Sequence, residues 1–385
     1  MNYIGAISLK FKGDKAIWVI LVFMSMISIL AVYSSTGSLA FEERGGDTEF
    51  FLFRRVIILL ISWTAAFIIH KIPVKYIRIF AVIALLVSLP FLVLNLFAGS
   101  RWATVPLVGI SIQFSEIAKV TLLVTTAWLL TILKHKLSEW RTFFILILPV
   151  TVFSGLIFFG DLSTAALIFF TNTILLFMGR VRLKHLASMA LVIGLLLFGL
   201  YKLIYAYPEF GRFGTWKNRI ENYMNPGVND DAGNYQIKQS KIAIATGGLT
   251  GKLPGKSTQR YILPEAHNDF IYSIIIEEYG SVVGAFLLIF YMILLYRSIS
   301  IFMKSEKTFN RLVVLGIGFM LAFQAMINMG VSVGIMPVTG QTLPAISQGG
   351  SSVLMTFVAI GIMQAITAQQ EEEKVREEVP DEQAH

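Results

Sequence analysis

The amino-acid sequence predicts an all-α integral membrane protein with about ten transmembrane helices. Hydrophobic residues make up 55% of the 385 positions and charged residues only 15%, whereas a soluble domain carries roughly 25% charged residues. The mean hydropathy is +0.70. The apolar residues are also gathered into runs near the roughly 20 residues that a helix needs to cross a bilayer. These observations exclude a soluble protein.

The ten apolar runs define the expected spans. We expect helices near residues 16–34, 51–70, 77–97, 115–133, 143–159, 162–178, 186–205, 270–296, 312–335 and 347–368. The first run is not followed by a cleavage site of small residues and a polar mature region. We therefore expect it to be a retained helix. The whole chain, residues 1–385, is expected to form a single polytopic membrane domain.

Lysine and arginine predict the orientation of these helices in the cytoplasmic (inner) membrane. Basic residues precede the first run and follow the second, fourth, sixth and eighth runs. Loops that carry such basic residues face the cytoplasm. Both termini are therefore expected inside, with residues 1–15 as a cytoplasmic N-terminus. Residues 369–385 are strongly acidic, which is typical of a solvated cytoplasmic tail.

A large extracytoplasmic loop is expected between spans 7 and 8, at residues 206–268. It is polar, rich in Gly and Asn, and long for a connection between helices. Its aromatic residues, among them Trp216 and Tyr261, favour an ordered segment. Function is therefore predicted on the external side.

The charge and cysteine content exclude other classes of function. The net charge of +8 comes from residues at the ends of apolar runs, which is a topology signal, so we expect no nucleic-acid partner. Cysteine is absent, which excludes a disulfide framework, a thiol nucleophile and a thiolate metal site.

The segment 263–270 carries the first candidate site, because Glu265, His267 and Asp269 lie where the loop returns to the membrane. Ionisable residues at a membrane boundary are costly unless paired or wetted, and they indicate a functional site. A carboxylate there is suited to general-base chemistry. The alternative is that Asp269 only caps the helix that begins at Phe270. Both interpretations stay open on the residues alone.

Two groups of charged residues stand at the external ends of other spans. Glu116 and Lys119 are three residues apart, so they form either a simple intrahelical ion pair or a cation directed into a polar cavity. Arg54 and Arg55 break the positive-inside pattern. They either extend to the membrane surface or bind an anionic headgroup.

Three further segments have unusual composition. Residues 99–109 are too short to span and too apolar for an ordinary loop, so a re-entrant segment is expected. Residues 340–352 are dense in Gly and Pro, which indicates a backbone that bends close to a helix or a ligand. Residues 251–257 imitate a phosphate-binding loop, but they have three residues between the glycines where that motif needs four. We therefore expect no nucleotide site.

Taken together, these segments resemble the SEDS family of cell-wall polymerases, which contains FtsW, RodA and SpoVE. The resemblance covers essentially the whole chain, and the order of the motifs makes it specific. The matching residues are Arg101 and Trp102, 113–119, 161–165, 219–220, 225–226, 233–236, 239–240, 247–248, 263–270, 277–278 and 334–352. Ala266, Thr339 and Gly340 resemble the division branch, FtsW, more than the elongation branch, RodA. Departures from the family pattern occur at Phe114, Gly160, Ser163, Lys241 and Gln348.

The resemblance implies a peptidoglycan glycosyltransferase that polymerises lipid II, an undecaprenyl-pyrophosphate-linked disaccharide-pentapeptide, during cell division. By the family's matching position, Asp269 would be the base that activates the acceptor hydroxyl, with inversion at the anomeric carbon. Glu116 would orient Lys119, and Glu265 or His267 would support Asp269. Cations for the pyrophosphate would come from Arg54, Arg101, Lys119, Arg219 and Lys241, and further substrate contacts from Gln236, Gln239 and Ser351.

The family also implies a partner, a class B penicillin-binding protein that cross-links the strands, beside the membrane lipids. No cofactor is required by the sequence. A divalent cation, Mg or Mn, at the pyrophosphate stays open, because the sequence has no dedicated ligand cluster. The alternatives in function are a lipid II flippase, an elongation-type RodA polymerase and a non-catalytic scaffold that recruits the transpeptidase. Nearly charge-free spans argue against the flippase.

Overall fold

The computed structural model describes residues 12–37, 45, 47–98, 103–105, 110–210, 213–224 and 232–378 of the chain. Within these residues, nine helices are long and apolar enough to cross a membrane, and α7 is a shorter apolar helix of 17 residues. The prediction of about ten spans in an all-α membrane protein is therefore confirmed. The helices are α1 (Lys15–Ser35), α3 (Thr48–Lys71), α4 (Val74–Ala98), α5 (Phe114–Ile132), α6 (Trp140–Phe158), α7 (Leu162–Met178), α8 (Leu183–Ala206), α11 (Ile271–Lys304), α12 (Thr308–Ser332) and α13 (Gly350–Glu378).

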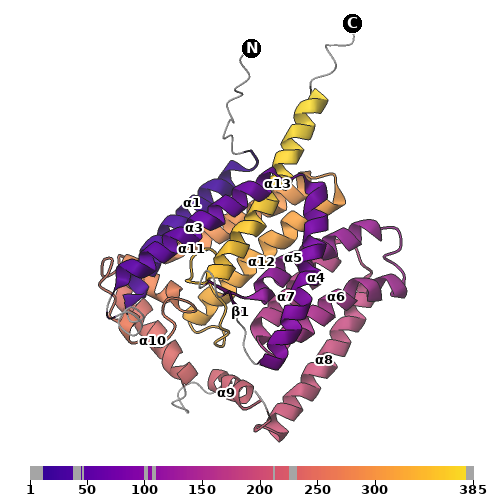
Figure 1. Ribbon diagram of the computed structural model, residues 1–385. Coiled ribbons are helices and arrows are strands. Elements are labelled where there is room, and N and C mark those ends of the chain that lie inside the picture. The colour runs from indigo at the N-terminus through magenta and orange to yellow at the C-terminus, as the bar shows by residue number, and fades with distance from the viewer. Residues whose placement is uncertain are drawn as a thin grey trace, which may run out of the picture.

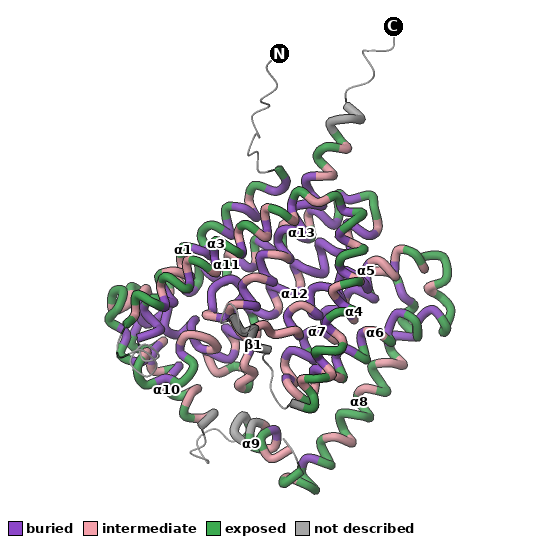
Figure 2. The backbone as a smooth tube through the Cα atoms, in the orientation of Figure 1, coloured by how far each residue is buried: buried purple, intermediate pink, exposed green. Residues whose placement is uncertain are grey.

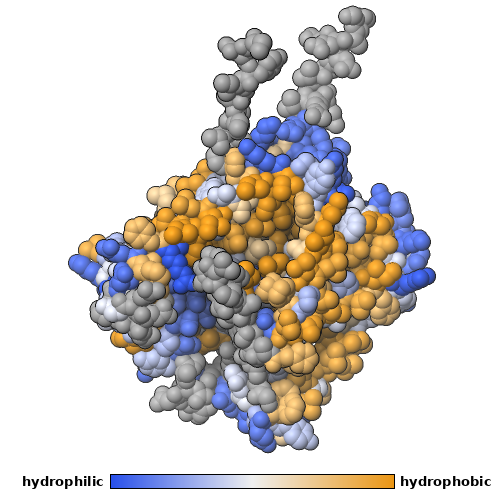
Figure 3. Space-filling model, in the orientation of Figure 1, coloured by the Kyte–Doolittle hydropathy of each residue, from blue (hydrophilic) through white to orange (hydrophobic). Residues whose placement is uncertain are grey.

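Burial separates a central group of helices from the periphery (Figure 2). The most apolar window of α13 is 89% buried, whereas that of α8 is 6% buried. Side chains of α8 such as Leu195 and Phe198 are exposed, as expected for a helix that contacts lipid on most sides. Hydrophobic residues cover much of the face in Figure 3, and hydrophilic residues gather toward its ends. The bundle therefore has the surface of a multi-pass membrane protein.

The two chain ends lie at one end of the bundle (Figure 1). The backbone N–H of Asp14 donates to Oε1 of Gln364 at 2.9 Å, and Nζ of Lys12 pairs with Oε1 of Glu372 at 2.6 Å. These contacts join the start of α1 to the end of α13. The opposite end of the bundle carries α9 and α10.

The connection between α8 and α11 is largely helical. It contains α9 (Phe213–Met224), α10 (Ala232–Gly247) and the 3-10 helix η1 (Gln259–Tyr261). The hydroxyl of Ser240 donates to the carbonyl of Ser332 at 2.7 Å, so α10 is held against the end of α12. This agrees with the ordered segment expected from its aromatic residues.

The apolar segment before α5 contains a short antiparallel hairpin where a re-entrant segment was expected. Strand β1 (Ala103–Val105) pairs with β2 (Ile110–Ile112), with Thr104 opposite Ser111. Pairing of the two strands satisfies backbone N–H and C=O groups of this short segment. A helix of the same length would leave most of these groups without partners, because the first four N–H groups and the last four C=O groups of a helix have none within it. Residues 99–102 and 106–109 lie outside the described residues.

Candidate active site

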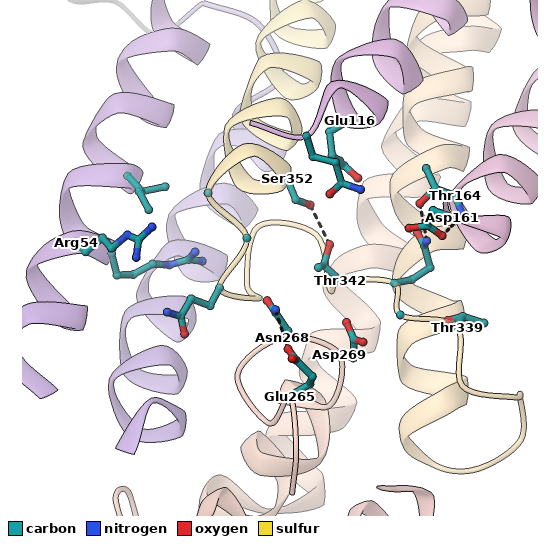
Figure 4. Close-up of a pocket in the computed structure, with 18 of the residues that line it drawn as sticks. Arg54, Glu116, Asp161, Thr164, Glu265, Asn268, Asp269, Thr339, Thr342 and Ser352 are labelled. Carbon is teal, nitrogen blue, oxygen red and sulfur yellow. Dashed lines mark hydrogen bonds between the residues drawn. The ribbon is translucent and has the colours of Figure 1, made fainter. Parts of the chain in front are cut away.

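A polar pocket of about 440 Å³ lies where α11 begins, between α3, α5, α7 and the loop 339–349 that connects α12 to α13. Figure 4 shows Asp269 and Glu265 on the turn below this loop, with Arg54 on one side and Asp161 on the other. The lining residues are Phe51, Arg54, Arg55, Ile58, Gln113, Glu116, Asp161, Thr164, Glu265, Asn268, Asp269, Thr339, Gly340, Gln341, Thr342, Gln348, Gly349, Gly350 and Ser352.

Asp269 is placed in this pocket by a tight turn. Glu265 has a positive φ of 56°, and its carbonyl accepts from the N–H groups of Asn268 at 3.0 Å and Asp269 at 3.1 Å. Helix α11 begins only at Ile271, with Phe270 as its N-cap residue and no side-chain cap. The alternative interpretation of Asp269 as the N-cap of this helix is therefore wrong.

The backbone of Asp269 is fixed by a buried amide on α12. Nδ2 of Asn328 donates to the carbonyl of Asp269 at 2.8 Å and to that of Gln341 at 2.7 Å. The hydroxyl of Ser347 also donates to the carbonyl of Asn268 at 2.7 Å. These hydrogen bonds hold the turn and the loop 339–349 together.

Gly340 lets this loop bend beside the carboxylate. Its φ is +74°, and a Cβ built on it would lie 3.6 Å from Oδ2 of Asp269. Left-handed backbone of this kind favours glycine. The bend that the Gly and Pro content predicted is therefore a bend beside Asp269.

Arg54 and Arg55 occupy different environments. Arg54 is exposed and lines the pocket, so its cation is available to an anion there. Arg55 is 2% exposed and donates to the carbonyls of Ala345, Ile346 and Ser347 at 2.9–3.0 Å, as well as to the hydroxyl of Ser28. The expectation that both extend to a membrane surface or bind a headgroup is wrong for Arg55, because its guanidinium is used to hold the loop.

Glu116 and Lys119 form a buried ion pair. Nζ of Lys119 lies 2.7 Å from Oε2 of Glu116 and donates to Oε1 of Gln324 at 2.8 Å. Glu116 lines the pocket and Lys119 does not. The interpretation as an intrahelical ion pair is therefore confirmed, and the interpretation of Lys119 as a cation directed into the polar cavity is wrong.

Glu265 and His267 precede Asp269 on the same turn. Oε2 of Glu265 accepts from Nδ2 of Asn268 at 3.1 Å and lies 3.8 Å from Nε2 of His267. The carbonyl of His267 accepts from the N–H of Gln348 at 3.0 Å. Glu265 lines the pocket, whereas His267 does not.

The other predicted substrate residues lie apart from the pocket or cannot be placed. Gln236, Gln239 and Lys241 are on α10 and do not line it; Lys241 lies against Gly334, where a Cβ would be 2.2 Å from its Cε. Ser351 is buried, and its hydroxyl accepts from the N–H of Gln113 at 3.3 Å. Its neighbour Ser352 lines the pocket instead. Arg101 and the side chain of Arg219 lie outside the described residues.

Several pocket residues were not among the predicted site residues. Oδ1 of Asp161 accepts from the N–H of Thr164 at 3.0 Å and caps α7, while Oγ1 of Thr164 accepts from Nε2 of Gln341 at 2.9 Å. The hydroxyls of Thr342 and Ser352 lie 2.9 Å apart. A carboxylate at the end of a span, the signal that drew attention to Asp269, was also present at Asp161.

The segment that imitates a phosphate-binding loop, residues 251–257, and the two residues after it bind a carboxylate of the protein itself. Backbone N–H groups of Thr258 and Gln259 donate to the carboxylate of Glu277, each at 3.2 Å, and Nζ of Lys252 lies 2.7 Å from it. Glu277 is 0% exposed. Successive N–H groups of a loop can hold an anion, and here the anion is a buried side chain of α11.

Carboxylates in the pocket are of the type that hard cations prefer. Asp161, Glu265 and Asp269 all line it. Within the part of the chain that the structure describes, however, no group of three or more His, Asp or Glu side chains is arranged to hold a metal ion. The divalent cation stays a prediction.

Comparisons with known proteins agree with this architecture. The family model described as "Cell cycle protein", for FtsW, RodA and SpoVE, matches residues 14–372. The chain is 30% identical over 371 residues to a probable peptidoglycan glycosyltransferase FtsW of Trichlorobacter lovleyi, covering 92% of this chain and 93% of the relative. It is also 30% identical to the stage V sporulation protein E of Bacillus subtilis, covering 92% of this chain and 96% of the relative.

Solved structures share the fold. A chain from a structure described as structural coordination of polymerization and crosslinking by a peptidoglycan synthase complex superposes with a TM-score of 0.69 at 23% identity, covering 92% of this chain and 97% of that chain. The rod shape determining protein RodA of Thermus thermophilus gives a TM-score of 0.64 at 22% identity, covering 92% of this chain and 96% of that chain. With a family match over nearly its whole length, the chain belongs to the FtsW/RodA/SpoVE family of membrane proteins.

Proposed function

We propose that this protein is a peptidoglycan glycosyltransferase that polymerises lipid II into glycan strands. The observation that carries the proposal is the pocket in which Asp269 and Arg54 lie together at one end of the helix bundle. Relatives named peptidoglycan glycosyltransferase cover more than nine-tenths of the chain. A carboxylate beside a cation at a membrane boundary is suited to the transfer of a sugar from a lipid pyrophosphate.

In the proposed reaction, a hydroxyl of the acceptor sugar attacks the anomeric carbon of the lipid-linked donor. Asp269 accepts the hydroxyl proton, the new glycosidic bond forms, and the bond to the pyrophosphate breaks. Undecaprenyl pyrophosphate leaves with both electrons of that bond. Because attack occurs opposite the leaving group, the anomeric carbon is inverted.

Arg54 is the pocket cation best placed to bind the leaving pyrophosphate, because Arg55 and Lys119 are already occupied by the protein. Glu265 and His267 support Asp269 on the same turn. Arg101, Arg219 and Lys241, with Gln236 and Gln239, would contact the lipid-linked substrate outside the pocket. Ser351 would act indirectly, through its neighbours Gln113 and Ser352. A divalent cation, Mg or Mn, would add positive charge at the pyrophosphate.

The proposed setting is the external face of the cytoplasmic membrane, with both termini in the cytoplasm. The end of the bundle with α9 and α10 would face outward and carry the pocket. We further propose that the protein acts in cell division with a class B penicillin-binding protein, which would cross-link the strands.

The experiment that tests this function uses the full chain with its penicillin-binding partner in liposomes containing lipid II. Polymerisation predicts glycan strands and one released undecaprenyl pyrophosphate for each bond formed. Movement of labelled lipid II across the bilayer without either product would overturn the polymerase in favour of a flippase. Neither product nor movement would favour a scaffold.

A further inference from the structure

A second cavity, of about 700 Å³, lies at the end of the bundle that carries both termini. It is formed between the segment before α1, the connection from α3 to α4, and the end of α13. Lys71, on its rim, follows Arg54 by 17 residues on α3, which is about 25 Å along a helix. Its lining residues are Lys12, His70, Lys71, Ile72, Pro73, Val74, Lys75, Ala365, Ala368, Gln369 and Glu372.

The charge of this cavity is mainly positive. Lys12 is paired with Glu372 at 2.6 Å. Lys71 and Lys75 are exposed, and in the described parts of the chain neither has a carboxylate partner. Nζ of Lys71 lies 4.3 Å from the ring centre of Phe67, a contact that orients a cation without neutralising it. Among the described residues, two cations without a carboxylate partner therefore line the cavity.

The floor of the cavity offers further groups to an anion. Helix α4 starts there at Val74, directly after Pro73, and the N-terminus of a long helix carries a partial positive charge. His70 is 6% exposed, and its buried Nδ1 has no hydrogen-bond partner among the described residues. A buried polar atom of this kind is satisfied by a bound molecule or by water.

The remaining wall indicates a lipid rather than a soluble anion. Ile72, Val74, Ala365 and Ala368 make it apolar, and the small alanines of α13 leave room beside it. Outside the cavity, Ile68 and Ile79 are each 56% exposed, on helices that face the membrane. A ligand in the cavity would thus have phosphate near lysines and carbon chains along an apolar helix surface.

We propose that this cavity binds the phosphate headgroup of an anionic phospholipid. Lys71 and Lys75 pair with the phosphate, the start of α4 donates to it, and the acyl chains lie along α3 and α4. The site is separate from the pocket around Asp269 and uses none of its residues.

The proposal is tested by native mass spectrometry of the full-length protein in detergent, titrated with phosphatidylglycerol or with phosphatidylcholine. Wild type is expected to retain phosphatidylglycerol preferentially, and the double variant Lys71→Gln/Lys75→Gln to bind it about tenfold more weakly. The matched control is Lys134→Gln/Lys136→Gln, which removes two exposed lysines at the same end of the bundle, outside the cavity. Its affinity should equal that of wild type.

A second variant keeps every charge. Ala368→Leu narrows the cavity and should also weaken phosphatidylglycerol binding, with thermal stability in lipid-free detergent as the folding check. Equal retention of both lipids by wild type, or equal losses in the two lysine double variants, would overturn the proposal. Displacement of the lipid by equimolar glycerol phosphate would also overturn it, because it would identify a soluble phosphate as the ligand.

Discussion

At the scale of single residues, the neighbours Arg54 and Arg55 show how helix geometry places two identical side chains in different environments. Successive residues of a helix point about 100° apart, so Arg54 is exposed in the pocket while Arg55, in the pocket wall, is buried against the loop 339–349. A buried guanidinium is stable only when its donors are satisfied. The carbonyls of the loop 339–349 accept from the two terminal nitrogens of Arg55, Nη1 and Nη2.

The two arginines are therefore expected to give opposite phenotypes. Arg54→Gln should raise KM for lipid II by roughly three- to tenfold and leave the thermal stability unchanged. Arg55→Gln should lower the free energy of unfolding by about 2–4 kcal/mol, because it leaves loop carbonyls without donors. Thermal unfolding and polymerisation kinetics on both variants check this, and a stable Arg55→Gln protein would contradict it.

Asn328 is expected to act as a positioning residue for Asp269. Asn328→Ala removes the two hydrogen bonds by which this amide bridges Asp269 and Gln341, so kcat should fall by about tenfold or more and stability by about 1–3 kcal/mol. The matched control is Asn172→Ala, a buried asparagine whose amide bonds only its own helix, to the carbonyl of Ile168. Similar kcat losses in both variants would indicate a general effect of destabilisation.

At the scale of elements, helix α11 depends on the loop that precedes it. The helix is interrupted at Gly280, whose φ is +86°, and a Cβ there would lie 2.1 Å from the carbonyl oxygen of Leu249. The N–H groups of Lys252 and Leu253 donate to the carbonyls of Glu277 and Glu278 at 2.9 and 3.0 Å. These bonds supply donors to helix carbonyls near the break, so the loop completes the hydrogen bonding of the helix there.

Glu277→Gln is expected to release this loop. The amide cannot accept all the donors that the carboxylate accepts, and Lys252 loses its ion pair, so the free energy of unfolding should fall by about 2–4 kcal/mol. Hydrogen exchange should quicken at residues 252–259 more than in α13. Unchanged exchange in the loop would mean that Glu277 does not hold it.

At the scale of the whole molecule, the bundle has two distinct ends. One carries the chain termini and the cavity beside Lys71, and the other carries α9, α10 and the pocket around Asp269.

The proposed orientation can be tested directly because the chain has no cysteine. Leu249→Cys, at a residue that is 73% exposed, should react with a membrane-impermeant maleimide added to intact cells. Lys136→Cys, at the opposite end, should react only after the membrane is opened. The reverse pattern would place the pocket in the cytoplasm.

The sequence predicted the fold well and the site in part, for physical reasons. Spans are encoded by long apolar runs, so every helix start and most helix ends were predicted within a few residues, whereas α11 and α13 continue to Lys304 and Glu378, past their apolar runs. The pocket indeed contains Arg54, Glu116, Glu265 and Asp269. The loop-holding role of Arg55 and the bridge made by Asn328 could not be predicted, because both join segments that are far apart in the chain. Ser352, which was not predicted, lines the pocket beside the predicted Ser351, because motif similarity does not give the direction of a side chain.

The central claim is that Asp269 is the base of a lipid II polymerase, and the most direct measurement compares polymerisation by wild type and Asp269→Asn with the penicillin-binding partner present. The asparagine keeps the size of the side chain but accepts no proton, so the rate should fall by about 10²- to 10⁴-fold with unchanged thermal stability. Asp47→Asn, the same exchange at the exposed N-cap of α3, should polymerise as wild type does. Equal rates in wild type and Asp269→Asn would contradict the assignment of Asp269 as the base.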